Sequence, residues 1–265
     1  MPPLVQIPES AGPVCITYNL PELKTPLKLS PTVVAGIYLG QIKTWQDPGI
    51  RKDNAGVNIP NHPIAVAHRS DGSGTTNIFT TYLAAVSPKW EKEIGKGLAV
   101  NWPVGLGGKG SEGVTGVVKQ TVGAIGYVEL SYAKENNLPV ALVKNKAGNW
   151  IEPSAAAATA AIEAFGPELA KDVRTPVVDP PASAKDAYPI SGLTFLLVAK
   201  QGKDAAREQI VKEFIQYIIT QGQNSAEGLA YSKLPQNLAD QDQKLLSELQ
   251  TGGQQQTSST QAPSR

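Results

Sequence analysis

The chain has 265 residues, a formal net charge of +1 and 18% charged residues, which excludes the strongly basic surface that nucleic-acid binding requires. Its single cysteine excludes an intrachain disulfide and a cysteine-based metal cluster. A chain of this length buries roughly three quarters of its unfolded surface, enough for one large or two modest domains.

The N-terminal region predicts a strand and no targeting segment. Residues 1–4 carry no basic segment followed by an apolar core, so we expect no secretory signal in this sequence. No run reaches the roughly 18 apolar residues of a membrane-spanning helix. Residues 4–20 are predicted to be extended, and Val14-Cys15-Ile16 is the most strand-like part. We expect Cys15 to be a small buried hydrophobe.

Helices and strands alternate through the middle of the chain. Ser30-Pro31 predicts the start of a helix that runs to Leu39, with Gly40 just past its end. Ser87-Pro88 is predicted to end the helix that follows residue 77. The other predictions are a turn-rich connection at 41–50 with buried Ile42 and Trp45, a helix at 111–120, a strand at 124–129, a helix to about 137, a strand at 140–143, and an alanine-rich helix from Pro153 to Phe165. Such alternation predicts α/β structure with parallel strands.

The last third predicts one strand and two helices. A proline-rich extended segment at 176–189 leads to a fully buried strand at 193–199. A long helix is predicted to start at Asp204 and to end at Gly222, and another covers residues 238–249. The apolar stripe of the first helix is Ile210, Val211, Phe214, Ile215, Ile218 and Ile219. The Gln- and Ser-rich tail, residues 251–265, is predicted to be disordered.

Residues 67–77 are the stretch most informative about function. An apolar run precedes them and apolar residues at helical spacing follow them, so the pattern predicts strand, glycine turn and helix. The start of such a helix offers unpaired N–H groups and the positive end of the helix dipole. Ser73, Thr75 and Arg69 add hydroxyl and guanidinium donors, which predicts a site for a tetrahedral oxyanion. The alternative is a plain helix cap with an Arg69–Asp71 loop ion pair.

Residues 105–110 match the pattern G-x-G-x-x-G, and Glu129 lies about 20 residues further on, as in a dinucleotide-binding fold. Pro103, just before the first glycine, does not suit the central strand that such a fold requires. The dinucleotide interpretation is therefore the weaker one.

The two histidines, His62 and His68, are expected to be structural, because two such residues make a poor metal site without carboxylate partners. Ser73 would need a histidine partner to act as a nucleophile, and its neighbours do not form G-x-S-x-G. We therefore expect no catalytic residues, no metal and no cofactor.

The motifs together resemble the phosphate-binding proteins of the ABC phosphate importer, the PstS family. The resemblance rests on residues 69–75, then 79–83, with support from 37–45, 105–110 and 123–129, in order along residues 4–249. It implies an α/β fold of the periplasmic-binding-protein type II, in which two α/β lobes joined by crossing strands close over phosphate. The implied domains are residues 1–23 (first crossing strand and remnant of lobe I), 24–193 (lobe II with the anion-binding loop), 194–250 (return crossing strand and C-terminal helices of lobe I) and 251–265 (disordered tail).

The resemblance also implies roles for five residues. Arg69 would be the cationic ligand, oriented by Asp71; Ser73 and Thr75 would donate hydroxyls, and Gly74 and Thr75 would donate backbone N–H groups. The chain would be a monomeric periplasmic or extracytoplasmic receptor that passes inorganic phosphate to membrane permease subunits, with no nucleic-acid partner. The open alternatives are a receptor for molybdate, sulfate or a phosphonate, and an enzyme: a nucleotide-dependent oxidoreductase using residues 105–110, or a phosphate-ester hydrolase using Ser73.

This sequence departs from the family in one respect. Family members usually begin, after a signal peptide, with a further first-lobe segment that carries more phosphate ligands, including an Asp thought to read the proton on phosphate and so to reject sulfate. We therefore expect an incomplete first lobe, and a fragment or a clipped gene rather than a minimal protein. Loss of about four charge-assisted hydrogen bonds would weaken binding by on the order of 6 kcal/mol, or about four decades of affinity.

Overall fold

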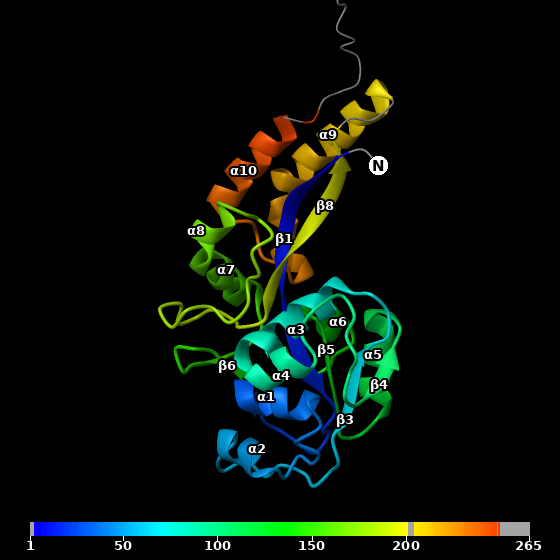
Figure 1. The fold of residues 1–265 in the computed structure, drawn as a ribbon, viewed down its shortest axis with the longest axis vertical. Helices are drawn as coiled ribbons and strands as arrows, with labels where there is room; N and C mark the ends of the chain where they lie inside the picture. Colours follow the sequence, from blue (N-terminus) through cyan, green and yellow to red (C-terminus); the bar gives the residue numbers. More distant parts are fainter. Residues whose placement is uncertain (1–2, 201–203, 248, 250–265) are drawn as a thin grey trace, which may run out of the picture.

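The computed structural model describes residues 3–200, 204–247 and 249 (Figure 1). An α/β body holds most of the strands, and a two-stranded ribbon extends from it with helices along its side. The predicted tail at 251–265 lies outside the described residues, and so does residue 248 near the end of the helix that was predicted to reach residue 249. Among the described residues, no helix combines the length and apolar character needed to cross a membrane.

Strand β1 (Leu4–Tyr18) connects the ribbon to the body. Its first part pairs antiparallel with β8 (Ser191–Ala199), and its second part, from Val14 onward, pairs antiparallel with β5 (Ala124–Glu129). The sheet continues through parallel pairs to β3 (Ala65–Arg69) and β4 (Leu106–Gly108), so its order is β4-β3-β5-β1-β8. One long strand therefore crosses between two parts of the molecule. A smaller sheet contains β2 (Lys28–Leu29), β6 (Leu142–Lys144) and β7 (Trp150–Ile151).

The helices cover these sheets. In chain order they are α1 (Pro31–Tyr38), α2 (Pro48–Asp53), α3 (Gly74–Val86), α4 (Pro88–Glu93), α5 (Gly110–Gln120), α6 (Leu130–Glu135), α7 (Ala155–Ala164), α8 (Gly166–Leu169), α9 (Ala205–Ile219) and α10 (Gln236–Ser247), with 3-10 turns at Gln221–Ser225 and Glu227–Leu229. The strand predicted at 124–129 is confirmed as β5. The helix predicted from Pro31 is confirmed as α1, and Gly40 beyond it has φ of +69°. The predicted burial of Cys15 and Trp45 is also confirmed.

Three short helices, α2, α4 and α8, were not predicted. Helices α2 and α4 each begin at a proline, which was interpreted as part of a connection or as a stop. A proline that ends one helix also fits the first position of the next, since its missing N–H would have no helical partner there. The side chain of Asp47 caps α2 through Gly49 N at 2.8 Å, and Ser87 caps α4 through Trp90 N at 3.2 Å.

Two predicted helix ends are wrong. The alanine-rich helix does not start at Pro153: Ser154 is the cap, and its hydroxyl accepts from Ala157 N at 3.1 Å. Helix α9 does not end at Gly222, because the chain leaves helical geometry at Thr220 and continues as a 3-10 turn. At Ser154 the side-chain cap places the start of the helix after Pro153.

The prediction of a fully buried strand at 193–199 is wrong. Leu197 on β8 is 61% exposed, because in the ribbon β8 pairs only with β1. The predicted stripe of α9 is correct in part: Ile215 and Ile219 pack with Val5 and Ile7 of β1, whereas Phe214 is 62% exposed. Apolar residues in the ribbon and in α9 are therefore more exposed than their sequence pattern predicts.

Helix α10 carries an unusual buried acid. The side chain of Asp242 is 0% exposed, and neither of its carboxylate oxygens has a hydrogen-bond partner among the described residues. It lies one helical turn from Leu238 and one from Leu246, both of which are buried. Burial raises the pKa of Asp242 from 3.8 to about 7. The carboxyl group is therefore protonated in the folded chain at mildly acidic pH.

We expect this group to make the fold less stable as the pH rises. Between pH 3.8 and about 7 the folded state binds the Asp242 proton more tightly than the unfolded state. The free energy of unfolding then falls with increasing pH. Asp242→Asn cannot ionise, so at about pH 8 it should be more stable than the wild type by on the order of 2 kcal/mol.

Urea unfolding at several pH values measures this effect, and Asp240→Asn on the exposed side of the same helix is the control. Asp240→Asn should keep the pH dependence of the wild type. If Asp242→Asn keeps the same dependence too, another group is responsible.

Candidate functional site

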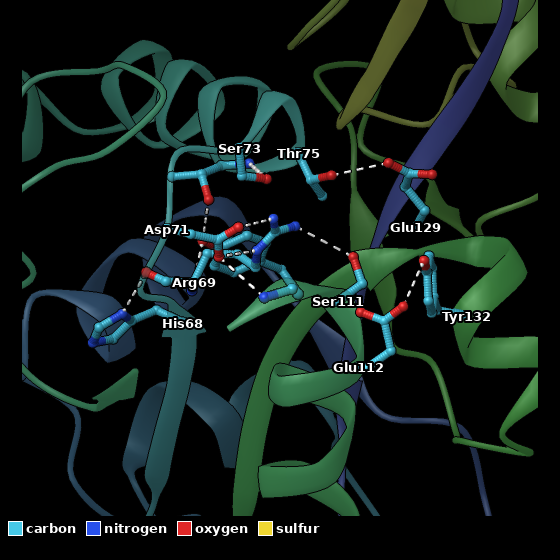
Figure 2. Close-up of polar contacts among 12 residues, drawn as sticks. His68, Arg69, Asp71, Ser73, Thr75, Ser111, Glu112, Glu129 and Tyr132 are labelled. Carbon is cyan, nitrogen blue, oxygen red and sulfur yellow. Dashed lines mark hydrogen bonds and ion pairs between the residues drawn. The ribbon is translucent and has the colours of Figure 1, made fainter. Parts of the chain in front are cut away.

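The end of β3, the turn after it and the start of α3 hold the five residues predicted to bind an anion, and Figure 2 shows this region. Strand β3 ends at Arg69 and α3 begins at Gly74, so the predicted strand, turn and helix are confirmed. Ser73 is the cap of α3, and its hydroxyl accepts from Thr76 N at 3.3 Å. Gly74 and Thr75 follow as the first helical residues, whose N–H groups have no partner within the helix. The turn therefore presents backbone donors at the positive end of the helix dipole.

Arg69 and Asp71 form a two-point ion pair in this turn. Arg69 Nε lies 2.8 Å from Asp71 Oδ1, and Arg69 Nη2 lies 2.7 Å from Asp71 Oδ2. Asp71 also accepts from Gly110 N at 3.1 Å. The Arg69 guanidinium and this N–H hold the pKa of Asp71 well below its usual range. Asp71 is thus charged at any physiological pH and fixes the plane of the guanidinium.

The remaining guanidinium nitrogen, Arg69 Nη1, points to a second helix. It lies 3.4 Å from the hydroxyl oxygen of Ser111, which is 7% exposed at the start of α5. Figure 2 shows the starts of α3 and α5 on either side of Arg69. Ser111 was not among the predicted site residues. Its only local sign is a hydroxyl residue directly after a glycine-rich loop.

Residues 105–110 support this site. Part of the loop is β4, and Arg69 of β3 lies opposite Gly108 in the parallel pair. Gly110 has φ of +71° and donates its N–H to Asp71. The loop that resembled a dinucleotide-binding pattern therefore positions the Arg69–Asp71 pair.

An aromatic core lies beneath the turn. The Tyr127 hydroxyl accepts from Arg69 N at 3.2 Å and lies 2.6 Å from Thr76 Oγ1. The ring of Tyr127 stacks on Phe79 of α3 at a centroid distance of 4.4 Å and lies 5.7 Å from Trp102. This packing holds β3, α3 and β5 together at the site.

Thr75 contacts a residue whose role the sequence analysis missed. Its hydroxyl donates to Glu129 Oε1 at 2.9 Å, at the end of β5. The other carboxylate oxygen, Glu129 Oε2, accepts from the Tyr231 hydroxyl at 2.6 Å. Glu129 was considered only as part of a dinucleotide pattern, and Tyr231 lies too far along the chain for any local pattern to connect it.

Both histidines make contacts within the protein. His68 stacks on Trp102 at a centroid distance of 4.9 Å, and its Nδ1 lies 3.0 Å from Arg69 O. His62 Nε2 pairs with Glu22 at 2.9 Å. Within the part of the chain that the structure describes, no three His, Cys, Asp or Glu side chains form a group suited to a metal ion.

The arrangement suits a tetrahedral oxyanion. One fixed guanidinium, the hydroxyl-bearing residues Ser73 and Thr75 and the start of α3 come together at this site. Donors of this kind bind oxygen atoms that carry negative charge.

Comparisons with known proteins agree with this chemistry. Residues 2–221 match the family model described as "PBP superfamily domain". The phosphate-binding protein PstS of Xylella fastidiosa is 40% identical over 239 residues, which cover 90% of this chain and 65% of the relative. PstS of Methanocaldococcus jannaschii is 43% identical, with 89% and 65% covered, and PstS of Pasteurella multocida is 40% identical, with 89% and 68% covered. The chain thus spans about 65% of the length of the first of these relatives.

Solved structures show the same fold. A high-affinity periplasmic phosphate-binding protein, PfluDING, with bound phosphate matches with a TM-score of 0.70 at 25% identity, covering 91% of this chain and 71% of that protein. A human phosphate-binding apolipoprotein matches with a TM-score of 0.69 at 22% identity, covering 91% and 72%. The second likeness concerns the fold alone.

Proposed function

We propose, from the premise that this chain belongs to the PstS family of phosphate-binding proteins and has their type II periplasmic-binding fold, that it binds inorganic phosphate at residues 69–75. The family consists of solute-binding proteins rather than enzymes. The proposal therefore concerns a binding site and a transport partner.

The single observation that carries the proposal is the Arg69–Asp71 pair at the start of α3. In the proposal Arg69 bonds one phosphate oxygen while Asp71 keeps its guanidinium in place. Gly74 and Thr75 donate backbone N–H groups, and the hydroxyls of Ser73 and Thr75 face the anion. A loose lysine would provide charge without this fixed geometry.

We also propose that the chain acts outside the cytoplasm as a monomer and delivers phosphate to the permease subunits of an ABC phosphate importer. The support is that the curated relatives are phosphate-binding proteins named PstS and that the matched PfluDING structure is described as periplasmic. The domain limits at 23, 193 and 250 stay a prediction. They agree with β1 and β8 as the two strands of the ribbon that extends from the α/β body.

Two alternatives remain. One is a receptor for another oxyanion, because sulfate and molybdate also fit a site of one guanidinium and neutral donors. The other is a phosphate-ester hydrolase that uses Ser73. An enzyme that uses residues 105–110 is disfavoured, because Gly110 of this loop donates its N–H to Asp71.

Phosphate titration of the isotope-labelled chain, followed by amide NMR, tests the proposal. We expect saturable shifts centred on Gly74 and Thr75. No saturable shift would contradict binding at this site, and tighter binding of sulfate or molybdate than of phosphate would assign the loop to another oxyanion.

A further inference from the structure

Thr75 has only one hydroxyl proton, and in this structure that proton is used within the protein. The Thr75 Oγ1 donates it to Glu129 Oε1 at 2.9 Å, and Figure 2 shows Thr75 directed toward Glu129. A hydroxyl donates to one acceptor at a time. An anion that takes the Thr75 proton must therefore displace Glu129 from it.

Glu129 is also bonded to a distant segment of the chain. Its second oxygen accepts from the Tyr231 hydroxyl at 2.6 Å. Burial and this bond raise the pKa of Tyr231 to about 12, so Tyr231 remains a donor at physiological pH.

Tyr231 lies against the crossing strand β1. The added Cβ of an alanine at Gly12 would lie only 3.1 Å from the Tyr231 ring. The next residue, Ser232, donates its N–H to Ala11 O at 2.7 Å. Glu129 thus connects the start of α3 to the C-terminal segment that is bonded to β1.

We propose that Glu129 competes with the anion for the Thr75 hydroxyl, which weakens anion binding and couples occupancy of the site to Tyr231 at the crossing strand. This inference rests on the function proposed above. When the anion takes the Thr75 proton, Glu129 keeps only its bond to Tyr231, so the contacts of Tyr231 change with occupancy. Glu129 is a positioning residue in this scheme, and its carboxylate additionally repels the anion.

Glu129→Gln tests the competition. The amide keeps the shape but is a weaker, neutral acceptor, so we expect phosphate to bind roughly three- to tenfold more tightly, the equivalent of one ordinary hydrogen bond. A purely structural role for Glu129 would instead give weaker binding. The affinity is measured by the amide NMR titration described above.

Glu112→Gln is the matched control. Glu112 lies in the first turn of α5 and accepts from Tyr132, not from Thr75, so this variant removes the same charge without freeing the Thr75 proton. We expect less than a twofold change. An equal increase in phosphate affinity in the two variants would mean that only the loss of a negative charge matters, and it would overturn the proposal. Weaker binding in Glu129→Gln would overturn it too.

The coupling has a separate readout. Phosphate should shift the ring signals of Tyr231 in the wild type, and the shift should be lost in Thr75→Val and in Glu129→Gln. If the Gly74 amide responds to phosphate while Tyr231 does not, the site binds as proposed and the coupling is wrong. If neither responds, the proposed function itself fails.

Discussion

Arg69→Ala is expected to lower the phosphate association constant by two decades or more. Arg69 is the only Lys or Arg in residues 67–77. Each charge-assisted hydrogen bond that it gives to phosphate contributes roughly 1.5–3 kcal/mol. The substitution also leaves Asp71 facing the anion without its partner. A combined loss of about 3 kcal/mol corresponds to about two decades of affinity.

Lys109→Ala is the control for this experiment. Lys109 is exposed next to the site and caps α5 through its backbone, without a side-chain cap bond. Its loss removes one positive charge from the same face and should change the affinity less than threefold.

Both variants are titrated with phosphate, and urea unfolding confirms that each is folded. Similar losses in the two variants would mean that general charge attraction, rather than the Arg69 guanidinium, binds the anion.

Arg69→Lys separates geometry from charge. A lysine cannot make the two-point contact with Asp71 that the guanidinium makes at 2.7 and 2.8 Å. We expect an affinity between those of the wild type and Arg69→Ala. An affinity equal to that of the wild type would show that charge alone is sufficient.

The anion-binding turn could be predicted because its information is local. The apolar run before residue 67, the glycines and the helical spacing after residue 77 define β3 and α3 without reference to the rest of the chain. Arg69 and Asp71 are two residues apart, so their ion pair could be considered from sequence alone.

The supporting contacts could not be predicted, because they join residues far apart in sequence. Ser111 reaches Arg69 across 42 positions, and Tyr231 reaches Glu129 across 102. The aromatic core beneath the turn is also built from residues far apart in sequence. Tyr127 was predicted only as part of the strand at 124–129, and no local pattern indicates that it lies beneath the turn.

The wrong predictions of burial and of helix ends have physical causes. The sequence pattern of an apolar strand is the same in a two-stranded ribbon and in the middle of a sheet, because the pattern depends on apolar character and not on the number of neighbouring strands. Leu197 and Phe214 were therefore expected to be buried, but both are exposed. Capping residues decide helix ends within a few positions, and Ser154 overrides the neighbouring proline for this reason.

Gly108→Ala should destabilise the fold and weaken anion binding together. A Cβ at Gly108 would lie 2.5 Å from Gly113 C and 2.6 Å from Val114 N, and both are backbone atoms of α5. These atoms cannot move aside alone, so β4 and α5 must separate. Overpacking of this kind destabilises a fold by about 3 kcal/mol. Separation also moves Gly110 and Ser111 away from the Arg69–Asp71 pair.

Gly116→Ala is the matched substitution in the same helix, and it should act in the opposite direction. Nothing lies within 4 Å of a Cβ at Gly116, so the alanine fits without contact. Replacing a glycine within a helix by alanine stabilises a protein by about 0.5–1 kcal/mol.

Urea unfolding and phosphate titration of both variants measure the two effects. A folded Gly108→Ala with normal stability but weakened binding would place the effect in the loop alone. Normal stability with normal binding would show that the added methyl group fits without separating β4 from α5 and without disturbing Arg69. The close approach of Gly108 to α5 would then contribute nothing to the anion site.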